Sequence, residues 1–193
     1  SIVLIWINIS PLFANVWQAL KHSAFQVASI ITTTGFATDD FDLWPQLSKS
    51  ILVVLMFVGA CAGSTGGGIK VSRFILVIKT VFKEIGSYLH PRSIKKINLD
   101  DKPVEHEVMR ATNVYFVTFF VIFVFSLLIV SLEEKDLVTN FTAVAATINN
   151  IGPGLEMVGP TANFGHFNPL TKWVLMFDML AGRLEIFPMI MLF

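Results

Sequence analysis

The chain has 193 residues, of which 54% are hydrophobic and only 15% charged, and its formal net charge is zero. Soluble domains carry about 25% charged residues, so this composition, with a mean hydropathy of +0.68, predicts a membrane protein. The balanced charge gives no sign of nucleic-acid binding, and the single cysteine, Cys61, excludes a disulfide framework within the chain.

The first segments along the chain are apolar but short. Ser1–Ile9 lacks the charged leader and cleavage site of a signal peptide, and the chain stops at Phe193 inside another apolar run, so we expect a portion of a longer protein. Leu12–Ile30 and Leu137–Asn149 are rich in small and polar residues and each precedes a glycine turn. They are too short or too polar to span a membrane comfortably, which predicts re-entrant half-helices.

Longer apolar runs predict the membrane spans. Ala111–Leu132 contains 22 residues without a charge, which as a helix is about 33 Å long and exceeds the roughly 30 Å of a hydrocarbon core. Ser50–Ile69 is a second uncharged run, interrupted by consecutive glycines, and a third apolar stretch begins near Leu170.

The distribution of charge predicts the orientation of the spans. Nine lysines and arginines lie between Lys70 and Arg110, whereas the other connections, such as Thr38–Asp42 and Glu133–Asp136, are acidic. The excess of basic residues in cytoplasmic loops places the segment 86–107 in the cytoplasm and the re-entrant turns outside.

The chain also contains an internal repeat. Ala24–Phe36 and Asn140–Pro153 both run from a phenylalanine through small residues to a polar turn with a central glycine, Gly35 or Gly152, and each is followed by an outer loop and an apolar segment. We therefore predict an all-α membrane fold of two span–pore-loop–span units. The first covers residues 1–85 with its opening span truncated, 86–107 is a basic linker, and 108–193 is the second unit with its last span truncated.

Such a unit can build an ion-selectivity filter. Backbone carbonyls after a re-entrant helix can replace the hydration shell of a cation, unpaired backbone is tolerated there only if it lines a cavity, and glycine permits the positive φ that aligning carbonyls requires. A simpler alternative is that both glycines only cap helices. The candidate filter residues are Thr33, Thr34, Gly35 and Phe36 in the first unit and Asn150, Ile151, Gly152 and Pro153 in the second.

The glycine-rich break has three alternative interpretations. A phosphate-binding loop needs G-x-x-x-x-G-K-[ST], but Gly63 and Gly68 are followed by Ile69, so the lysine is one position late and no hydroxyl follows in register. A packing kink is the second interpretation, since glycine is frequent in membrane helices. The third is a mobile flap across the ion path, because helix backbone opened at membrane depth needs water or a pore to satisfy it.

Four motifs together resemble the potassium-translocating subunits of the Trk/Ktr/HKT family of cation transporters. They are "ITTTGF", "GACAGSTGGGIKVSR", "NNIGPG" and "LAGRLEIFP". The resemblance implies a bacterial inner-membrane protein for potassium uptake, with K⁺ as the transported ion and no organic cofactor. It implies four span–loop–span units around one pore, of which this chain holds the third and fourth. It also implies a homodimer in membrane lipid and a cytosolic nucleotide-binding regulatory ring of the TrkA type.

The same resemblance favours a gate below the filter. The family's intramembrane gating loop matches the residues Gly63, Ser64, Thr65, Gly66, Gly67 and Gly68, and the family has an arginine at the place of Arg183. A charge at bilayer depth normally faces a cavity or a partner, and neither Asp178 nor Glu185 is at helical pairing distance from Arg183. We expect it to oppose resting cations, with snorkelling to the interface as the alternative.

Two other classes of function are alternatives. An ion-coupled secondary transporter would also have glycine-interrupted spans, but its inverted repeats would place the two turns on opposite sides. An enzyme would need a convergent catalytic set, and none is visible in the sequence. Coupling to H⁺ or Na⁺, and preference for K⁺ over Na⁺, stay open because half of the expected filter lies outside this chain.

Overall fold

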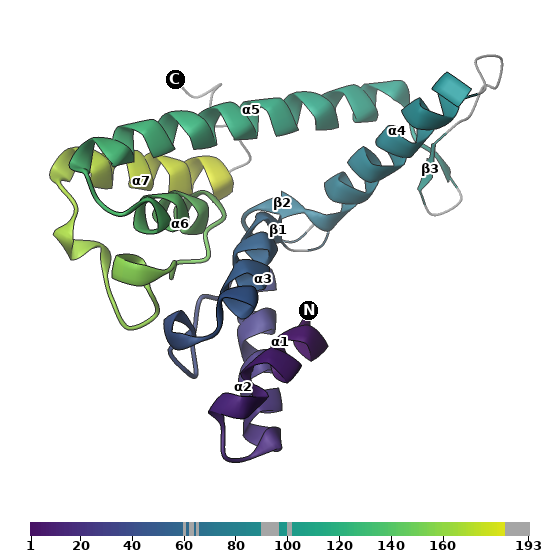
Figure 1. The fold of residues 1–193 in the computed structure, drawn as a ribbon. Coiled ribbons are helices and arrows are strands. Elements are labelled where there is room, and N and C mark those ends of the chain that lie inside the picture. The colour runs from purple at the N-terminus through teal and green to yellow at the C-terminus, as the bar shows by residue number, and fades with distance from the viewer. Residues whose placement is uncertain (60, 62–63, 65, 90–96, 100–101, 184–193) are drawn as a thin grey trace.

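The computed structural model describes residues 1–59, 61, 64, 66–89, 97–99 and 102–183. Two helical bundles lie side by side, and an arm made of α4 and the first part of α5 extends from them (Figure 1). Of the predicted residues, Gly63, Thr65 and Glu185 lie outside the described residues, as does much of the predicted linker 86–107.

The first bundle contains α1 (Ile2–Ile9), the 3₁₀ turn η1 (Ser10–Leu12), α2 (Val16–Ile31), η2 (Phe41–Leu43) and α3 (Gln46–Phe57). The side chain of Asn15 caps α2 by accepting a hydrogen bond from the backbone N–H of Trp17. Ile5, Ile9 and Met56 are fully buried where α1, α2 and α3 meet. The helix predicted over Leu12–Ile30 is thus α2, which begins after a 3₁₀ turn made with Pro11.

The predicted span Ser50–Ile69 is broken at the expected place. Helix α3 ends at Phe57, and the strand β1 (Val58–Gly59) pairs in parallel with β2 (Ile69–Lys70). The chain therefore leaves the helix and returns beside the point of departure before α4 (Val71–Leu89) begins. A short antiparallel pair, β3 (Asn98–Leu99) and β4 (Lys102–Pro103), follows.

The second bundle contains α5 (His106–Val130), η3 (Ser131–Glu133), α6 (Leu137–Ile148), η4 (Glu156–Val158), η5 (Phe164–His166) and α7 (Pro169–Arg183). Helix α6 contacts α5, α7 and α3, and almost all of its second half is buried. Phe57 of α3 packs edge-on against Phe119 and Phe123 of α5, so an aromatic cluster joins the two bundles.

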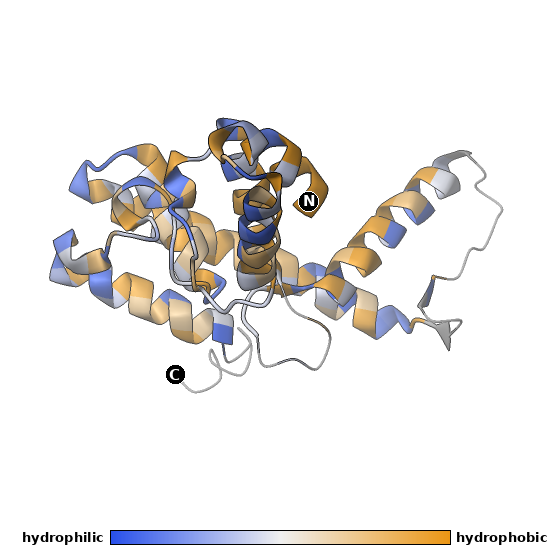
Figure 2. Cartoon of the chain, turned by 90° about the horizontal axis from the view of Figure 1, so that it is seen from below, coloured by the Kyte–Doolittle hydropathy of each residue, from blue (hydrophilic) through white to orange (hydrophobic). Residues whose placement is uncertain are grey.

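Helix α5, with the turn that follows it, is the one helix among the described residues that is long and apolar enough to cross a membrane. It begins five residues before the uncharged run predicted from sequence, because His106–Arg110 continue the helix at its polar end. Many of its large apolar side chains are exposed, among them Val117, Phe120 and Phe125, which suits a lipid environment. Apolar residues are frequent along the helices throughout the described chain (Figure 2).

Candidate ion pathway

The two predicted turns have the same backbone conformation. Thr33 and Asn150 both adopt a φ of 54°, and the glycine two residues later is also left-handed, with a φ of 78° at Gly35 and 106° at Gly152. The sequence repeat thus corresponds to a repeat of local geometry, although threonine and asparagine share no chemistry that would align them.

The hydrogen bonds that close the two helices also match. After α2, the N–H of Thr34 donates to Ser29 O at 2.9 Å, and after α6 the N–H of Ile151 donates to Ala146 O at 2.8 Å. The donor is the third residue beyond the helix. With the bonds from Thr33 N–H to Ile30 O at 3.1 Å and from Asn150 N–H to Thr147 O at 3.0 Å, it completes a Schellman cap, whose left-handed residue is Thr33 or Asn150. The left-handed cap residue of each helix is thus Thr33 or Asn150, and the glycine follows two residues later, although the N–H of Gly152 also donates to Ala146 O at 3.4 Å.

Thr33 is strained in this position. A β-branched residue in the left-handed region is a genuine outlier, and such conformations cost about 1–3 kcal/mol and persist only where the surroundings enforce them. The φ of 54° at Thr33 therefore indicates that the turn after α2 is held by its contacts and not by local preference.

The two turns meet each other. A Cβ added to Gly35 would overlap the carbonyl oxygen of Ile151, whereas a Cβ on Gly152 would meet nothing within 4 Å. A cavity of about 640 Å³ is lined by both turns and by α6 and α7, and it includes the predicted filter residues Thr33, Thr34, Asn150, Ile151 and Gly152. Gly35 and Pro153 line a neighbouring cavity of about 300 Å³. Phe36 is 70% exposed.

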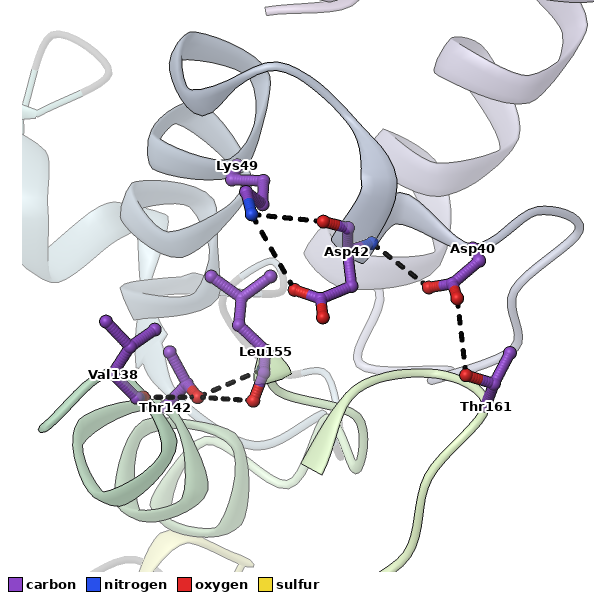
Figure 3. Close-up of polar contacts among 7 residues, drawn as sticks. All are labelled: Asp40, Asp42, Lys49, Val138, Thr142, Leu155 and Thr161. Carbon is purple, nitrogen blue, oxygen red and sulfur yellow. Dashed lines mark hydrogen bonds and ion pairs between the residues drawn. The ribbon is translucent and has the colours of Figure 1, made fainter. Parts of the chain in front are cut away.

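Each returning segment is tied to its own helix by a hydroxyl group. Ser29 Oγ donates to the carbonyl oxygen of Phe36 at 2.6 Å, so this oxygen lies toward α2. In the second unit, Thr142 Oγ1 donates to Val138 O at 2.7 Å and accepts from the N–H of Leu155 at 3.0 Å (Figure 3). The segments after both turns are thereby held against the helices that precede them.

The loops that follow the two turns also lie together. Thr161 Oγ1 of the second unit is 3.3 Å from Asp40 Oδ2 of the first, and Asp40 Oδ1 accepts from the N–H of Asp42 at 3.1 Å (Figure 3). Lys49 of α3 donates to Asp42 O at 3.0 Å. The loops that follow α2 and α6 therefore lie on the same side of the molecule.

The glycine break lies at the carboxyl end of α6. A Cβ on Gly67 would stand 2.6 Å from Asn149 O, and a Cβ on Gly68 would stand 3.0 Å from Asn149 Oδ1. Gly68 also has a left-handed φ of 79°. Ser64 is exposed and its Oγ accepts from the N–H of Gly66 at 3.1 Å. The break thus contacts the residue immediately before the turn of the second unit.

Arg183 lies at the end of α7, near the same turn. A Cβ on its neighbour Gly182 would overlap the carbonyl oxygen of Ile148, and Asn150 Nδ2 donates to Met179 O at 2.9 Å. The Arg183 side chain is exposed, and within the part of the chain that the structure describes it forms no salt bridge. Asp178, which the sequence left without a partner, is buried and accepts from Ser126 Oγ at 2.7 Å.

Three residues with a structural part in this site were missed from the sequence, namely Ser29, Thr142 and Asn149. The position of Ser29 carries alanine in the other repeat, so the repeat gives no signal for it. Asn149 matches Thr32, and both side chains donate to a carbonyl one turn back, at Ala145 and Ala28. Recurrence of a polar side chain just before the left-handed residue could have identified that pair.

The repeated turns, the exposed apolar surface and the long α5 are features of a helical membrane protein. The chain belongs to the TrkH family of cation transport proteins, whose family model matches residues 12–193. This confirms the family resemblance of the sequence motifs, and the family is one of transporters and not of enzymes.

Relatives and a solved structure agree with this assignment. The chain is 37% identical over 185 residues to the Trk system potassium uptake protein TrkH of Salmonella typhimurium, covering 94% of this chain and 38% of that protein. It is 39% identical over 173 residues to TrkG of Escherichia coli, covering 89% of this chain and 35% of the relative. The potassium transporter TrkH from Vibrio parahaemolyticus has the same fold, with a TM-score of 0.90 and 36% identity, covering 99% of this chain and 41% of that one. The chain thus spans about two fifths of its relatives.

Proposed function

We propose that the chain supplies two span–pore-loop–span units of a protein that takes up K⁺ across the bacterial inner membrane through a gated, channel-like pore. The names of the relatives support potassium as the transported ion. The observation that carries the proposal is the contact of two turns with the same left-handed backbone, in which Gly35 packs on the carbonyl of Ile151.

In this proposal the carbonyl groups of the turns coordinate K⁺ in place of water. The partial negative charge at the carboxyl ends of α2 and α6 also favours a cation there. Thr33, Thr34, Gly35 and Phe36 form the first wall. Phe36 is its last residue, and its carbonyl is held toward α2 by the hydrogen bond from Ser29. Asn150, Ile151, Gly152 and Pro153 form the second wall, and two further walls come from outside this chain.

The residues Gly63–Gly68 are the proposed gate. The support is the contact of Gly67 and Gly68 with Asn149, the residue immediately before the turn that forms the proposed second wall. Asn149 Oδ1 is buried and has no hydrogen-bond partner among the described residues, so it is available to a donor from the gate when the gate changes position.

Arg183 is proposed as an electrostatic barrier under the filter. It ends the same helix whose Met179 is bonded to Asn150 of the turn, and its guanidinium has no neutralising carboxylate among the described residues. A positive charge at this point opposes the passage of K⁺ and makes conduction depend on the position of α7.

The contact between the outer loops weighs against the alternative of an inverted-repeat transporter. Inverted repeats place equivalent loops on opposite sides of the membrane, whereas Thr161 and Asp40 of the two units are 3.3 Å apart. The proposed assembly is a homodimer in membrane lipid, with a cytosolic nucleotide-binding ring of the TrkA type at the basic face.

The test is a recording of K⁺ current from the full-length protein reconstituted in planar bilayers. Discrete unitary currents, larger than the turnover of an alternating-access transporter can carry, are the expected result. Uptake by wild-type protein in vesicles without any unitary current would reject the pore and favour the coupled transporter.

A further inference from the structure

A groove with two basic side chains lies between α4 and α5, away from the proposed ion pathway. It encloses about 280 Å³, and its lining includes Lys83 of α4 and Arg110 of α5, with Thr80 and Asn113 beside them. Lys83 is half-buried and Arg110 exposed. The two helices lie side by side here, at the end of the arm that extends from the bundles (Figure 1).

The net charge of the groove suits an anion with a single negative charge. Glu84 and His106 also line it, so with neutral histidine the two cations exceed the one carboxylate by a single charge. A phosphodiester carries one negative charge, whereas inorganic phosphate near neutral pH carries between one and two. Hydroxyl and amide groups of Thr80 and Asn113 add neutral polar groups to the same lining.

An apolar stripe leads out of the groove along α5. Val114 lines the groove and is 46% exposed, and Val117, Val121 and Phe125 follow on the same face with exposures of 66%, 58% and 65%. Val121 and Phe125 in turn line a second groove of about 460 Å³, which α5 forms with α7.

The spacing of these features matches one lipid molecule. From Arg110 to Val121 the helix rises about 16 Å, at 1.5 Å per residue, which is close to the length of an extended acyl chain. The basic groove is at the end of the arm where lysine and arginine gather. In the proposed orientation this is the cytoplasmic side, where membranes carry anionic lipid and basic pockets between helices bind lipid head groups.

We propose that this groove binds an anionic phospholipid, with the phosphodiester between Lys83 and Arg110 and one acyl chain along Val114, Val117 and Val121 into the groove with α7. The lipid would fasten the arm of α4 and α5 to the inner leaflet. The site is separate from the proposed filter and gate, and it rests on the proposed membrane orientation only for the choice of leaflet.

The experiment measures lipid retained by the full-length protein in detergent, by native mass spectrometry, after exchange into mixed micelles of phosphatidylglycerol and phosphatidylcholine. Removing one cation, with Lys83→Gln or Arg110→Gln, is expected to lower retention of phosphatidylglycerol about five-fold. Lys83→Arg keeps the charge and is expected to retain the lipid. Lys21→Gln removes an exposed lysine of α2 and is the matched control.

Two further experiments distinguish a bound phospholipid from bound inorganic phosphate. Long-chain phosphatidylglycerol is expected to displace the bound lipid at lower concentration than the dihexanoyl form, because only the long chain reaches the groove with α7. Inorganic phosphate at the same concentration is expected not to displace it. Equal retention by Lys83→Gln and Lys21→Gln, displacement by inorganic phosphate, or a second protein chain bound in place of lipid would each overturn the proposal.

Discussion

Gly35 and Gly152 occupy matching positions in the two turns, but their surroundings differ. Both need a left-handed φ, which costs an L-residue about 1–2 kcal/mol. In addition, a side chain at Gly35 would overlap the Ile151 carbonyl, while one at Gly152 would meet open space. The same substitution therefore has one unfavourable effect at Gly152 and two at Gly35.

We predict that Gly35→Ala lowers the K⁺/Na⁺ permeability ratio of the full-length protein more than Gly152→Ala does. The added methyl group at Gly35 pushes the two turns apart, so the carbonyls change direction in both units. At Gly152 only backbone strain acts, and we expect a loss of about five- to thirty-fold at most, which corresponds to 1–2 kcal/mol. The measurement is the reversal potential under bi-ionic conditions.

The two variants serve as each other's control, because both place the same methyl group on a left-handed glycine. Wild-type permeability ratios in both would remove the turns from the filter. A larger loss at Gly152 would mean that the space near Gly152 is filled by a part of the protein outside this chain.

At the scale of the elements, the hydroxyl of Ser29 connects α2 to the segment that returns from the first turn. The hydrogen bond to Phe36 O is 2.6 Å long and Ser29 is buried, and one such bond contributes about 0.5–1.5 kcal/mol. We predict that Ser29→Ala lowers the K⁺/Na⁺ permeability ratio by up to about ten-fold while the amount of folded protein stays near that of the wild type.

Ser23→Ala is the matched control for this prediction. Ser23 is a buried serine of the same helix, and its hydroxyl donates to Leu20 O within α2. Because this bond does not reach the turn, the control is expected to keep wild-type selectivity. An equal loss in both variants would show that α2 is disturbed as a whole and that Ser29 has no separate positioning role.

The glycine break and α6 are joined by a contact that leaves no room for a side chain. A Cβ on Gly67 would stand 2.6 Å from Asn149 O and 2.7 Å from Asn150 Cβ. We predict that Gly67→Ala moves the proposed gate away from α6 and raises K⁺ flux per folded protein, with the K⁺/Na⁺ ratio unchanged. The measurement is ⁸⁶Rb⁺ uptake into vesicles with a counted number of protein molecules.

A change of selectivity in Gly67→Ala would mean that the break belongs to the filter and is not a separate gate. Unchanged flux and selectivity together would support the interpretation of Gly63–Gly68 as a packing kink.

Much of this arrangement could be predicted from sequence, because it depends on features that are local along the chain. The uncharged run of α5, the small residues of α6 and the glycines of both turns each indicate their own conformation. The left-handed Thr33 could not be predicted, because a β-branched residue disfavours that conformation and only contacts made in the folded protein enforce it.

Contacts between segments that are distant along the chain also could not be predicted from the sequence. Asp178 lacks a charged partner at helical spacing in the chain, and its bond to Ser126 joins positions 52 residues apart. The contact of Gly67 with Asn149 likewise depends on how the break folds back against α6. Spacing rules cover neighbours within one helix, so pairs of this kind appear only once the helices are packed.

At the scale of the whole molecule, the two units contact each other at three places. Phe57 packs against Phe119 and Phe123, Gly35 lies on Ile151, and the outer loops meet at Asp40 and Thr161. The pathway proposed here therefore depends on both units together, and so does the effect of a charge placed at its inner end.

We predict that Arg183→Ala raises K⁺ flux and lowers its dependence on the proposed regulatory ring, while selectivity is largely kept. Two unit charges ~6 Å apart at an effective dielectric constant of about 20 repel by roughly 3 kcal/mol. Water and counter-charge reduce this to about 1–2 kcal/mol, or about five- to thirty-fold in rate. The measurement is flux per reconstituted full-length protein, with and without the ring.

Arg183→Lys is the control that keeps the charge, and it is expected to conduct like the wild type. If the arginine has only a structural role, the alanine variant will lose assembly and show no gain in flux per folded molecule. Unchanged or lower flux in the alanine variant would therefore reject the barrier.

The two turns have the same backbone conformation but different side chains. Thr33 in the first turn is equivalent to Asn150 in the second, and Ser29 is equivalent to Ala146. In a channel made of identical subunits, one codon change alters every copy of the turn at once. Here each copy is encoded separately, so a mutation alters one copy and leaves the other intact. During evolution the two turns can therefore acquire substitutions independently, as long as Gly35 and Gly152 keep the left-handed conformation of each turn.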